Sequence, residues 1–229
     1  MVDFSDIKGF TFDLDGVITD TAKFHEQAWR QLASELHVNW SDELGNQLKG
    51  IGRMDSLNMI LAASGEQDKY SEEEKQAFSV QKNTHYVELI QKITPADILP
   101  GITAFLAEIK DRGYVASIAS ASKNAPKILQ KLGITDNFVG IVDPATLSHG
   151  KPDPEIFIKA GQLLQLEPHQ IIGLEDASAG VQAIKAAGQT ALGIGESAKS
   201  ADPQLWVEST VEITLEKIEH ELMISENKV

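Results

Sequence analysis

The sequence predicts an α/β fold in which a parallel-sheet core carries an inserted all-helical domain. After Pro95, short apolar runs alternate with helical segments, a pattern typical of βαβ units and a parallel sheet. One earlier apolar run, close to the amino terminus, is followed by helical patterns with few strand signals. We therefore expect a Rossmann-like core formed by residues 1–18 and 95–229, with an α-helical cap domain at residues 19–94 inserted after the first strand.

The first strand is expected in the run Lys8-Gly9-Phe10-Thr11, which two acids follow at Asp13 and Asp15. Because strand side chains alternate with a period of two, both acids would point the same way beyond the carboxyl end of this strand. Paired carboxylates in such a place can bind a hard cation, and one of them can act as a nucleophile. Taken alone, the pair is also compatible with a solvated turn, since Asp and Gly are common turn residues.

Helical patterns fill the segment that follows, up to about Ile93. Apolar residues recur at i, i+4 spacing over residues 24–36, as in an amphipathic helix, and further apolar residues follow at 57–61. The charged run at residues 71–75 predicts a capped helix start, because acids are favoured near the positive end of the helix dipole. This segment is therefore expected to form a small all-helical unit.

The rest of the chain supplies the remaining core elements. Pro100-Gly101 precedes an apolar helix that is expected to end near Gly113. Strands are expected at residues 115–119, 139–142, 171–174 and 190–194, and helices around residues 125–132, 155–164 and 179–187. A last helix that frays is expected after Leu215.

Polar residues follow several of these expected strands. Ser120, Lys151 and the pair Glu175-Asp176 each come after a different apolar run, the lysine after an intervening loop. In open parallel sheets ligands bind beyond the carboxyl ends of the strands, so these side chains would meet Asp13 and Asp15 at one edge. Each of them alone is compatible with a helix cap, a loop lysine or a strand-end turn. Their joint occurrence predicts a functional site.

The residue types at this edge suit one kind of chemistry. Asp13, Asp15 and Asp176 supply hard oxygen ligands, which favour Mg²⁺ over softer metals. Three clustered acids would repel one another without a cation, so a metal and a nearby lysine are physically reasonable. Lys151 supplies a positive charge and Ser120 a hydroxyl donor, and together they could hold a phosphoryl group in line with an attacking carboxylate.

Composition limits the partners and the location of the protein. The net charge of −14 argues against nucleic acid and anionic membranes as partners, since both require a basic face. The absence of cysteine excludes disulfides, thiolate metal sites and cysteine nucleophiles. The amino terminus lacks a basic segment followed by an apolar one, and no apolar run is long enough to span a bilayer. We therefore expect a cytoplasmic protein, and we expect it to be a monomer.

The chain resembles, over nearly its whole length, the haloacid dehalogenase superfamily of phosphoryl-transfer enzymes. The motifs that carry this resemblance are Asp13-Leu14-Asp15-Gly16-Val17, Ser120, Lys151 and Glu175-Asp176. Longer strings are similar to the sugar-phosphate mutases of the superfamily, and these are Phe12 to Thr21, Leu48-Lys49-Gly50, Ser120 to Asn124 and Gly173 to Asp176. One departure is Ala177, where relatives commonly have Ser.

The resemblance implies roles for the core residues. Asp13 would be the nucleophile that forms an aspartyl phosphate, and Asp15 would be the general acid/base. The Mg²⁺ ion would be bound by the Asp13 carboxylate, the Asp15 backbone carbonyl and Asp176, with Glu175 close by. The groups implied to hold the transferring phosphate are Ser120, the backbone amide of Ala121 and Lys151.

A mutase of this kind must bind a bisphosphate in two orientations, so it requires a second phosphate site. By resemblance Arg53 holds the distal phosphate from the cap, where its planar fork can bind two oxygens at once. The residues implied to contact the same phosphate from the core are Ser122, Lys123 and Asn124. The other cap residues assigned to the substrate site are Thr21, His25, Lys49, Gly50 and Lys82. Two linkers, at Thr21 and at residues 94–97, would allow the cap to close and exclude water.

The implied function is that of an Mg²⁺-dependent mutase that converts a glucose 1-phosphate into glucose 6-phosphate through a bisphosphate, with small sugar phosphates as its partners. Two alternatives stay open: a sugar-phosphate phosphatase on the same scaffold, and a non-catalytic binding protein. Release of phosphate faster than formation of glucose 6-phosphate would favour the phosphatase. The complete set of acids, serine and lysine at the predicted edge argues against the binding protein.

Overall fold

The computed structural model describes residues 3–48 and 51–226, and the chain divides into two compact units. One unit comprises Met1–Asp20 and Thr94–Val229, and the other comprises Thr21–Ile93. These limits differ slightly from the expected ends of the cap at residues 19 and 94. Thr19 belongs with the first unit, because its backbone pairs with Asp15 and Ile98 and its hydroxyl donates to the Asp97 carbonyl at 2.7 Å.

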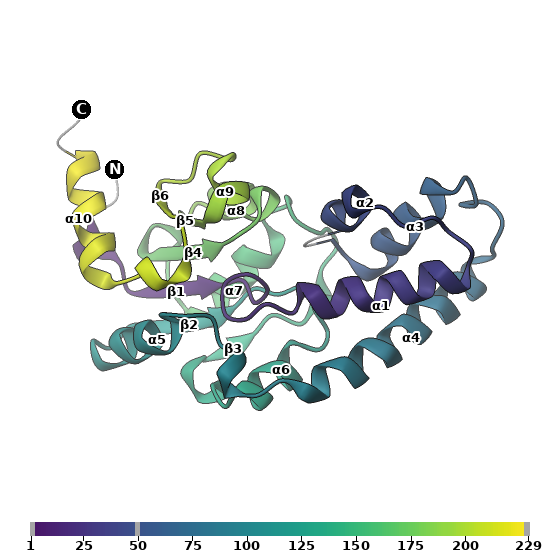
Figure 1. The fold of residues 1–229 in the computed structure, drawn as a ribbon. Coiled ribbons are helices and arrows are strands. Elements are labelled where there is room, and N and C mark those ends of the chain that lie inside the picture. The colour runs from purple at the N-terminus through teal and green to yellow at the C-terminus, as the bar shows by residue number, and fades with distance from the viewer. Residues whose placement is uncertain (1–2, 49–50, 227–229) are drawn as a thin grey trace. The chain divides into compact units, whose positions relative to one another are not determined.

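The first unit is built on a six-stranded parallel sheet with the order β3-β2-β1-β4-β5-β6 (Figure 1). Its strands are β1 (Gly9–Phe12), β2 (Val115–Ile118), β3 (Gly140–Ile141), β4 (Ile171–Glu175), β5 (Thr190–Ile194) and β6 (Leu205–Val207). Its helices are α5 (Ile102–Asp111), α6 (Ala125–Leu132), α7 (Glu155–Leu164), α8 (Ser178–Ala186), α9 (Gly195–Lys199) and α10 (Leu215–Glu226). This strand order is that of a Rossmann-type fold, so the predicted fold class is confirmed.

Strand β1 lies in the middle of the sheet and is buried on both faces. Phe10 packs edge-on against Phe105 of α5, with ring centroids 5.4 Å apart, on one face. Thr11 faces the other side, where its hydroxyl donates to Gln189 Oε1 at 2.7 Å. Gln189 in turn donates to the backbone carbonyl of Phe157 in α7 at 2.8 Å. The alternation of side chains along β1 thus connects helices on both faces to the strand that ends at Asp13.

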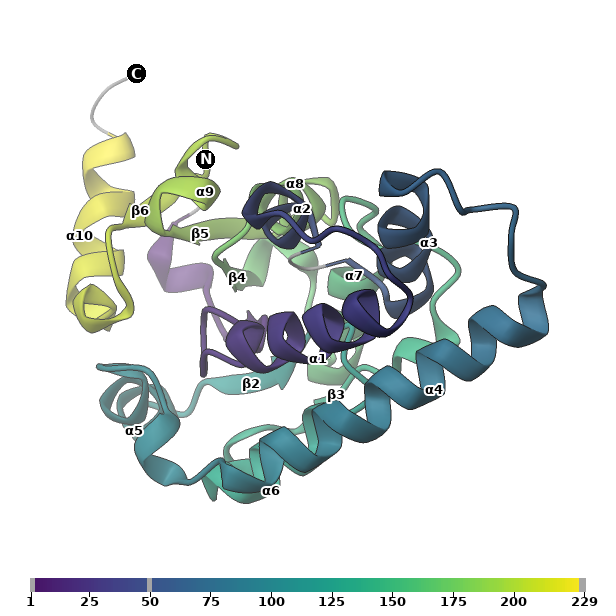
Figure 2. The ribbon, with the colours of Figure 1, turned by 45° about the vertical axis from the view of Figure 1, so that its right-hand side comes forward.

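The second unit is all-helical, as predicted, and consists of α1 (Ala22–Glu35), α2 (Asp42–Gln47), α3 (Arg53–Ala63) and α4 (Glu72–Leu89) (Figure 2). Its own hydrophobic core is formed by Trp29, Leu32, Ala33, Leu36, Val38, Leu44, Leu48, Leu57, Ile60 and Leu61. The predicted helix start at Ser71 is confirmed as a capping box, in which Ser71 Oγ accepts from Glu74 N and Glu74 Oε2 accepts from Ser71 N.

Strand β6, helix α9 and several 3-10 turns were not predicted, and one strand is shorter than expected. Strand β6 and helix α9 follow β5 closely, and their few residues carry too little periodicity to be recognised in the sequence. Strand β3 spans only Gly140–Ile141 rather than residues 139–142, although the amides of Val139 and Val142 still donate to carbonyls of β2.

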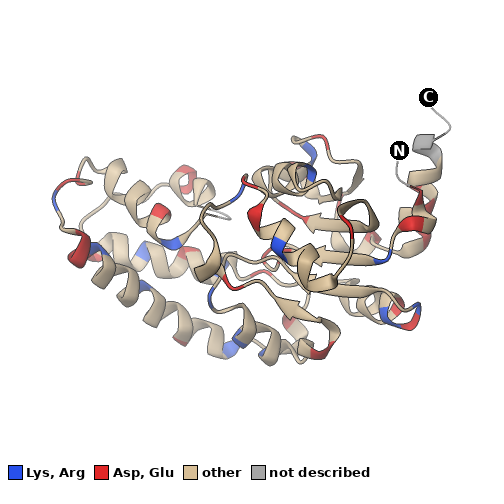
Figure 3. Cartoon of the chain, turned by 180° about the vertical axis from the view of Figure 1, so that it is seen from behind, with Lys and Arg blue, Asp and Glu red and all other residues tan. Residues whose placement is uncertain are grey.

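Charged residues are spread over both units. Figure 3 shows basic residues interspersed with acidic ones along the helices and loops of each unit. Among the residues that the structure describes, no helix has both the length and the apolar character needed to cross a bilayer.

Candidate active site

The carboxyl ends of β1, β2 and β4 bring together the residues that follow them. The backbone pairing continues past the end of β1, since Asp13 N donates to Leu174 O at 3.0 Å and Ala119 N donates to Phe12 O at 2.7 Å. Asp13 and Ser120 are both buried, with 8% and 3% of their surfaces exposed. The site lies where the strand order reverses between β1 and β4, the usual ligand position in such sheets.

A tight turn carries Asp15 away from the strand. Gly16 has a positive φ of 79°, its amide donates to Thr19 O at 2.9 Å, and Asp15 forms a β-bridge with Thr19. A Cβ on Gly16 would lie 2.1 Å from Oδ2 of Asp176, so the turn can lie against that carboxylate only because residue 16 is glycine. The Gly in the Asp-x-Asp-Gly motif therefore serves both the turn and the packing of Asp176.

Lys151 connects two of the acids. Its Nζ lies 2.6 Å from Asp13 Oδ1 and 2.6 Å from Glu175 Oε2, and only 6% of its side chain is exposed. The aromatic ring of Phe157 lies below the ammonium, with its centroid 5.0 Å from Nζ. The peptide bond between Lys151 and Pro152 is cis. A single buried cation thus neutralises part of the acidic charge at the sheet edge.

Three carboxylates at this edge could hold a metal ion. Asp13, Glu175 and Asp176 each offer an oxygen, and these oxygens all lie within 4.8 Å of one another. The Asp15 carboxylate is not part of this group among the described residues, and a metal contact of the Asp15 backbone carbonyl stays a prediction. Carboxylate oxygens are the ligands that hard divalent cations such as Mg²⁺ prefer, so the donor set fits such an ion.

The pKa values of these acids also favour a bound cation. Burial raises the pKa of Asp13 to about 7, assisted by the charges of Glu175 and Asp15, and the opposing effect of Lys151 is smaller. Burial, together with Glu175 and Asp13, also raises the pKa of Asp176 to about 8. The pKa of Lys151 is raised by the two acids that it contacts, although burial opposes this. The site therefore has an excess of negative charge that a bound cation would relieve.

The segment from Ser120 to Asn124 leads from β2 into α6. Ser122 N donates to Ser120 Oγ at 3.2 Å, and Asn124 N donates to Ser122 Oγ at 3.2 Å. Asn124 is the N-cap residue of α6, and Ala121 and Lys123 are exposed. These two serine turns fix the backbone of the loop that leads into α6.

In the helical unit, three of the predicted residues form one cluster with Tyr86. Lys82 Nζ lies 2.8 Å from His25 Nδ1, and the His25 and Tyr86 rings lie 3.9 Å apart between centroids. The Tyr86 hydroxyl donates to Thr21 Oγ1 at 3.2 Å. Lys82 is buried and also lies over the ring of Trp29, 4.6 Å from its centroid. Burial, assisted by Lys82 and Arg53, lowers the pKa of His25 well below its ordinary value, so its imidazole is neutral at pH 7.

Arg53 begins α3 and donates from Nη2 to Asn83 Oδ1 at 2.8 Å. Sequence reasoning missed both Asn83 and Tyr86. Their positions on α4 were the available signal, since Asn83 is adjacent to Lys82 and Tyr86 lies one helical turn beyond it. Two further predicted substrate residues, Lys49 and Gly50, lie outside the residues that the structure describes.

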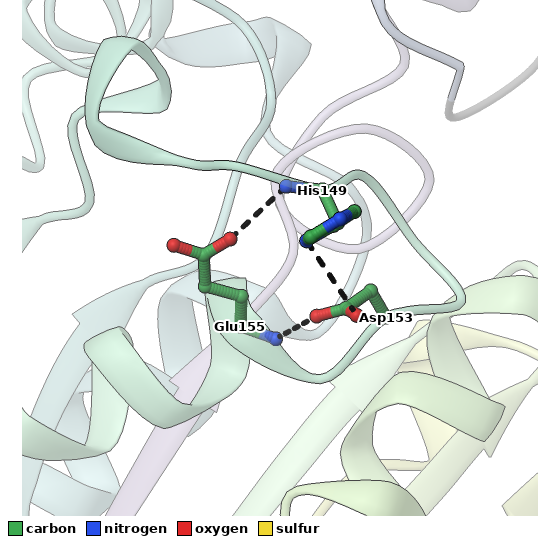
Figure 4. Close-up of side chains that lie close together, drawn as sticks. All are labelled: His149, Asp153 and Glu155. Carbon is green, nitrogen blue, oxygen red and sulfur yellow. Dashed lines mark hydrogen bonds and ion pairs between the residues drawn. The ribbon is translucent and has the colours of Figure 1, made fainter.

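A second group of potential metal ligands lies in the loop that carries Lys151 (Figure 4). Glu155 Oε2 accepts from His149 N at 3.0 Å, Asp153 Oδ1 accepts from Glu155 N at 2.9 Å, and His149 Nδ1 lies 4.0 Å from Asp153 Oδ2. Glu155 Oε1 also contacts Lys159 Nζ at 2.7 Å. Hydrogen bonds from Lys159, His149 and Ser148 lower the pKa of Glu155 to about 2. The hydrogen bonds and ion pairs of this group therefore hold the loop against the start of α7.

Comparisons with known proteins agree with this geometry. A family model for haloacid dehalogenase-like hydrolases matches residues 7–188. The chain is 44% identical over 215 residues to the β-phosphoglucomutase of Bacillus subtilis, a match that covers 94% of this chain and 95% of that protein. A crystal structure of β-phosphoglucomutase from Clostridium difficile superposes with a TM-score of 0.93 at 41% identity, over 97% of this chain and 100% of that one. A phosphorylated carbohydrates phosphatase of Thermotoga maritima is 26% identical over 179 residues, 77% of this chain and 80% of that protein.

Proposed function

The chain belongs to the haloacid dehalogenase-like hydrolases, and we propose that it is a β-phosphoglucomutase, which interconverts β-D-glucose 1-phosphate and D-glucose 6-phosphate. The observation that carries this proposal is the high identity, over nearly the full length, to the mutase of Bacillus subtilis. The ion pairs of Lys151 with Asp13 and Glu175 support the chemistry, because they provide a charged, buried site at which a phosphoryl group can be held.

In the proposed reaction Asp13 is the nucleophile. One oxygen of its carboxylate attacks a phosphorus atom of β-D-glucose 1,6-bisphosphate, and the bond between that phosphorus and the sugar oxygen breaks as the aspartyl phosphate forms. Asp15 donates a proton to the departing sugar oxygen, and in the reverse step it accepts the proton of the attacking sugar hydroxyl. The aspartyl phosphate then transfers its phosphoryl group to the 6-hydroxyl of β-D-glucose 1-phosphate, while Asp15 accepts the proton of that hydroxyl. The bisphosphate so formed reorients, and Asp13 takes the phosphate from its C1 oxygen, which Asp15 protonates. D-glucose 6-phosphate leaves, and the aspartyl phosphate is regenerated.

The family implies a divalent cation, and we propose Mg²⁺. The carboxylates of Asp13, Glu175 and Asp176 provide the hard oxygen donors, and the Asp15 backbone carbonyl would complete the protein ligands. When bound, the ion would supply positive charge that stabilises the transferring phosphoryl group. The raised pKa values of Asp13 and Asp176 support this assignment, since they arise from burial and from charges that lie close together.

The remaining predicted residues would hold the phosphates and the sugar. Ser120, the Ala121 amide and Lys151 would hold the transferring phosphate. Arg53 would bind the distal phosphate, for which its contact with Asn83 presents the guanidinium in a fixed orientation. The other residues proposed to contact this phosphate or the sugar are Thr21, His25, Lys49, Gly50, Lys82, Ser122, Lys123 and Asn124.

A sugar-phosphate phosphatase is the second candidate, because a carbohydrate phosphatase of Thermotoga maritima is also similar to the chain. A coupled assay separates the two. The protein is incubated with β-D-glucose 1-phosphate, Mg²⁺ and catalytic β-D-glucose 1,6-bisphosphate, and both glucose 6-phosphate and free phosphate are followed. We expect glucose 6-phosphate to form much faster than phosphate, and only with the β anomer. Faster phosphate release would identify a phosphatase, and no turnover of the β anomer by folded protein would exclude the mutase.

Substitution of the nucleophile tests the enzymatic assignment itself. Asp13→Ala should abolish turnover and phosphorylation of the protein, whereas a binding protein would keep its function. A cytoplasmic location and a monomeric state stay predictions, which fractionation of cells and light scattering of the purified protein would test.

A further inference from the structure

Gly180 lies in the first turn of α8, with its Cα directly against the carboxylate of Glu175. A Cβ on its backbone would lie 1.9 Å from Oε2 and 2.0 Å from Cδ of Glu175. Its φ is not in the left-handed region, so its conformation alone does not require glycine. Alanine is favoured over glycine within helices, so the reason for a glycine here is the close approach of the carboxylate.

The carboxylate of Glu175 is also held from its other side. Oε2 is 2.6 Å from Lys151 Nζ, and Oε1 accepts from the backbone amides of Asp176 at 3.2 Å and Ala177 at 3.1 Å. Only 1% of Glu175 is exposed, so its carboxylate cannot move aside without breaking these contacts in the protein interior. A side chain at residue 180 would therefore displace Oε2, the atom that binds Lys151.

Resting on the function proposed above, we propose that Gly180 is a positioning residue for the metal- and phosphate-binding groups of this protein. Because Gly180 has no side chain, the carboxylate of Glu175 can occupy its observed position. In that position Glu175 binds Lys151, and it lies close enough to Asp13 and Asp176 to share a metal ion with them. The three atoms nearest to a Cβ at this position all belong to Glu175, so the role of Gly180 is exerted through this acid.

The test begins with Gly180→Ala. Calorimetry of the substrate-free protein should show Mg²⁺ binding weakened by about 10- to 100-fold, the range typical when a group that supports metal ligands is changed. A crystal structure of the metal-free variant should show the Glu175 carboxylate displaced and its contact with Lys151 broken. The matched control is Gly161→Ala in α7, where a Cβ would meet only Ile171 Cδ1 at 3.0 Å and Gln189 Nε2 at 3.2 Å. This control adds a methyl group to another buried helical glycine, and its Mg²⁺ affinity should equal that of the wild type.

A second substitution separates positioning from simple damage to the helix. Glu175→Asp shortens the acid by one methylene, so in the Gly180→Ala background it should make room for the new methyl group. We expect the double variant to bind Mg²⁺ more tightly than Gly180→Ala alone, although Glu175→Asp alone binds it more weakly than the wild type. Should Gly180→Ala fail to fold, the shorter acid should also restore folding, because the clash lies with Glu175.

Wild-type Mg²⁺ affinity in Gly180→Ala, an undisplaced carboxylate, or losses that simply add in the double variant would each overturn the proposal. These measurements need no sugar phosphate. A protein that binds Mg²⁺ but has no mutase turnover would therefore refute the proposed function and leave the role of Gly180 standing.

Discussion

The ammonium of Lys151 lies 2.6 Å from Oδ1 of Asp13, and the two residues are separated by 138 positions in the chain. The pair is buried, and the same nitrogen also binds Glu175. Breaking a buried ion pair by removing one partner leaves the other charge without compensation, which is more costly than the pair was favourable. Loss of this contact should therefore lower both the stability of the first unit and the rate of phosphoryl transfer.

Lys151→Met tests that connection. Without a metal ion, we expect the free energy of unfolding to fall by about 3–5 kcal/mol, as for other broken buried pairs. The mutase rate should fall by roughly 100- to 1000-fold, the effect of removing one donor from a developing charge. Urea denaturation and the coupled assay measure the two quantities. Lys69→Met is the control, because its pair with Glu66 is exposed and should contribute at most about 1 kcal/mol. Equal losses in the two variants would contradict the prediction.

The raised pKa values of Asp13 and Asp176 predict how stability depends on pH. In the folded protein the two carboxyls take up protons near pH 7 and 8, whereas their ordinary value is 3.8. Between these values the folded state holds more protons than the unfolded chain, so these two groups make the metal-free protein less stable as the pH rises. Thermal unfolding in EDTA at several pH values should show this slope, and Asp176→Asn should reduce it. An unchanged slope in this variant would refute the assignment.

Metal binding should have the opposite dependence on pH. Mg²⁺ requires ionised carboxylates, so its binding releases protons below about pH 8 and its affinity increases as the pH rises toward that value. Calorimetry in buffers of different ionisation enthalpy would measure the protons released. No proton release at pH 7, or tighter binding at lower pH, would contradict the prediction.

The contact of Arg53 with Asn83 predicts a role for Asn83 in substrate affinity. Asn83→Ala removes the acceptor that orients the guanidinium, so we expect KM for the sugar phosphate to rise by roughly three- to tenfold with little change in kcat. Steady-state kinetics with β-D-glucose 1-phosphate measure both constants. Asn58→Ala, at an exposed position of α3, is the control and should leave KM unchanged. The same rise in KM for both variants would show that Asn83 has no specific role.

The capping box of α4 predicts a purely structural effect. Ser71→Ala leaves Glu74 N without its acceptor and should reduce the stability of the helical unit by about 1 kcal/mol. Glu73→Gln lies in the same turn but outside the box, and its loss should be only about 0.3 kcal/mol, that of a weak helix-dipole interaction. Denaturation followed by circular dichroism compares them. A larger loss for Glu73→Gln would contradict the assignment of the cap.

Much of the fold could be predicted because it is encoded locally. The alternation of apolar runs and helical patterns indicated a parallel sheet, and the capped start at Ser71 could be read from neighbouring residues. Strand β6 was missed because three residues at a sheet edge carry almost no periodic signal. In the helical unit, Lys82 and His25 were named from resemblance. Tyr86 lies one turn from Lys82 on α4, but its contacts with His25 and Thr21 depend on the packing of α1 against α4.

The sequence by itself determined the fold class, the order of the elements and the acids, serine and lysine that follow the strands, because the carboxyl ends of parallel strands must share one edge. Only the tertiary structure decided which of these groups touch. Lys151 and Asp13 come from segments 138 positions apart, and their contact depends on how the loop before α7 packs against the sheet. The roles of Asn83 and Gly180 likewise depend on distances between side chains and backbone, which no spacing along the chain specifies.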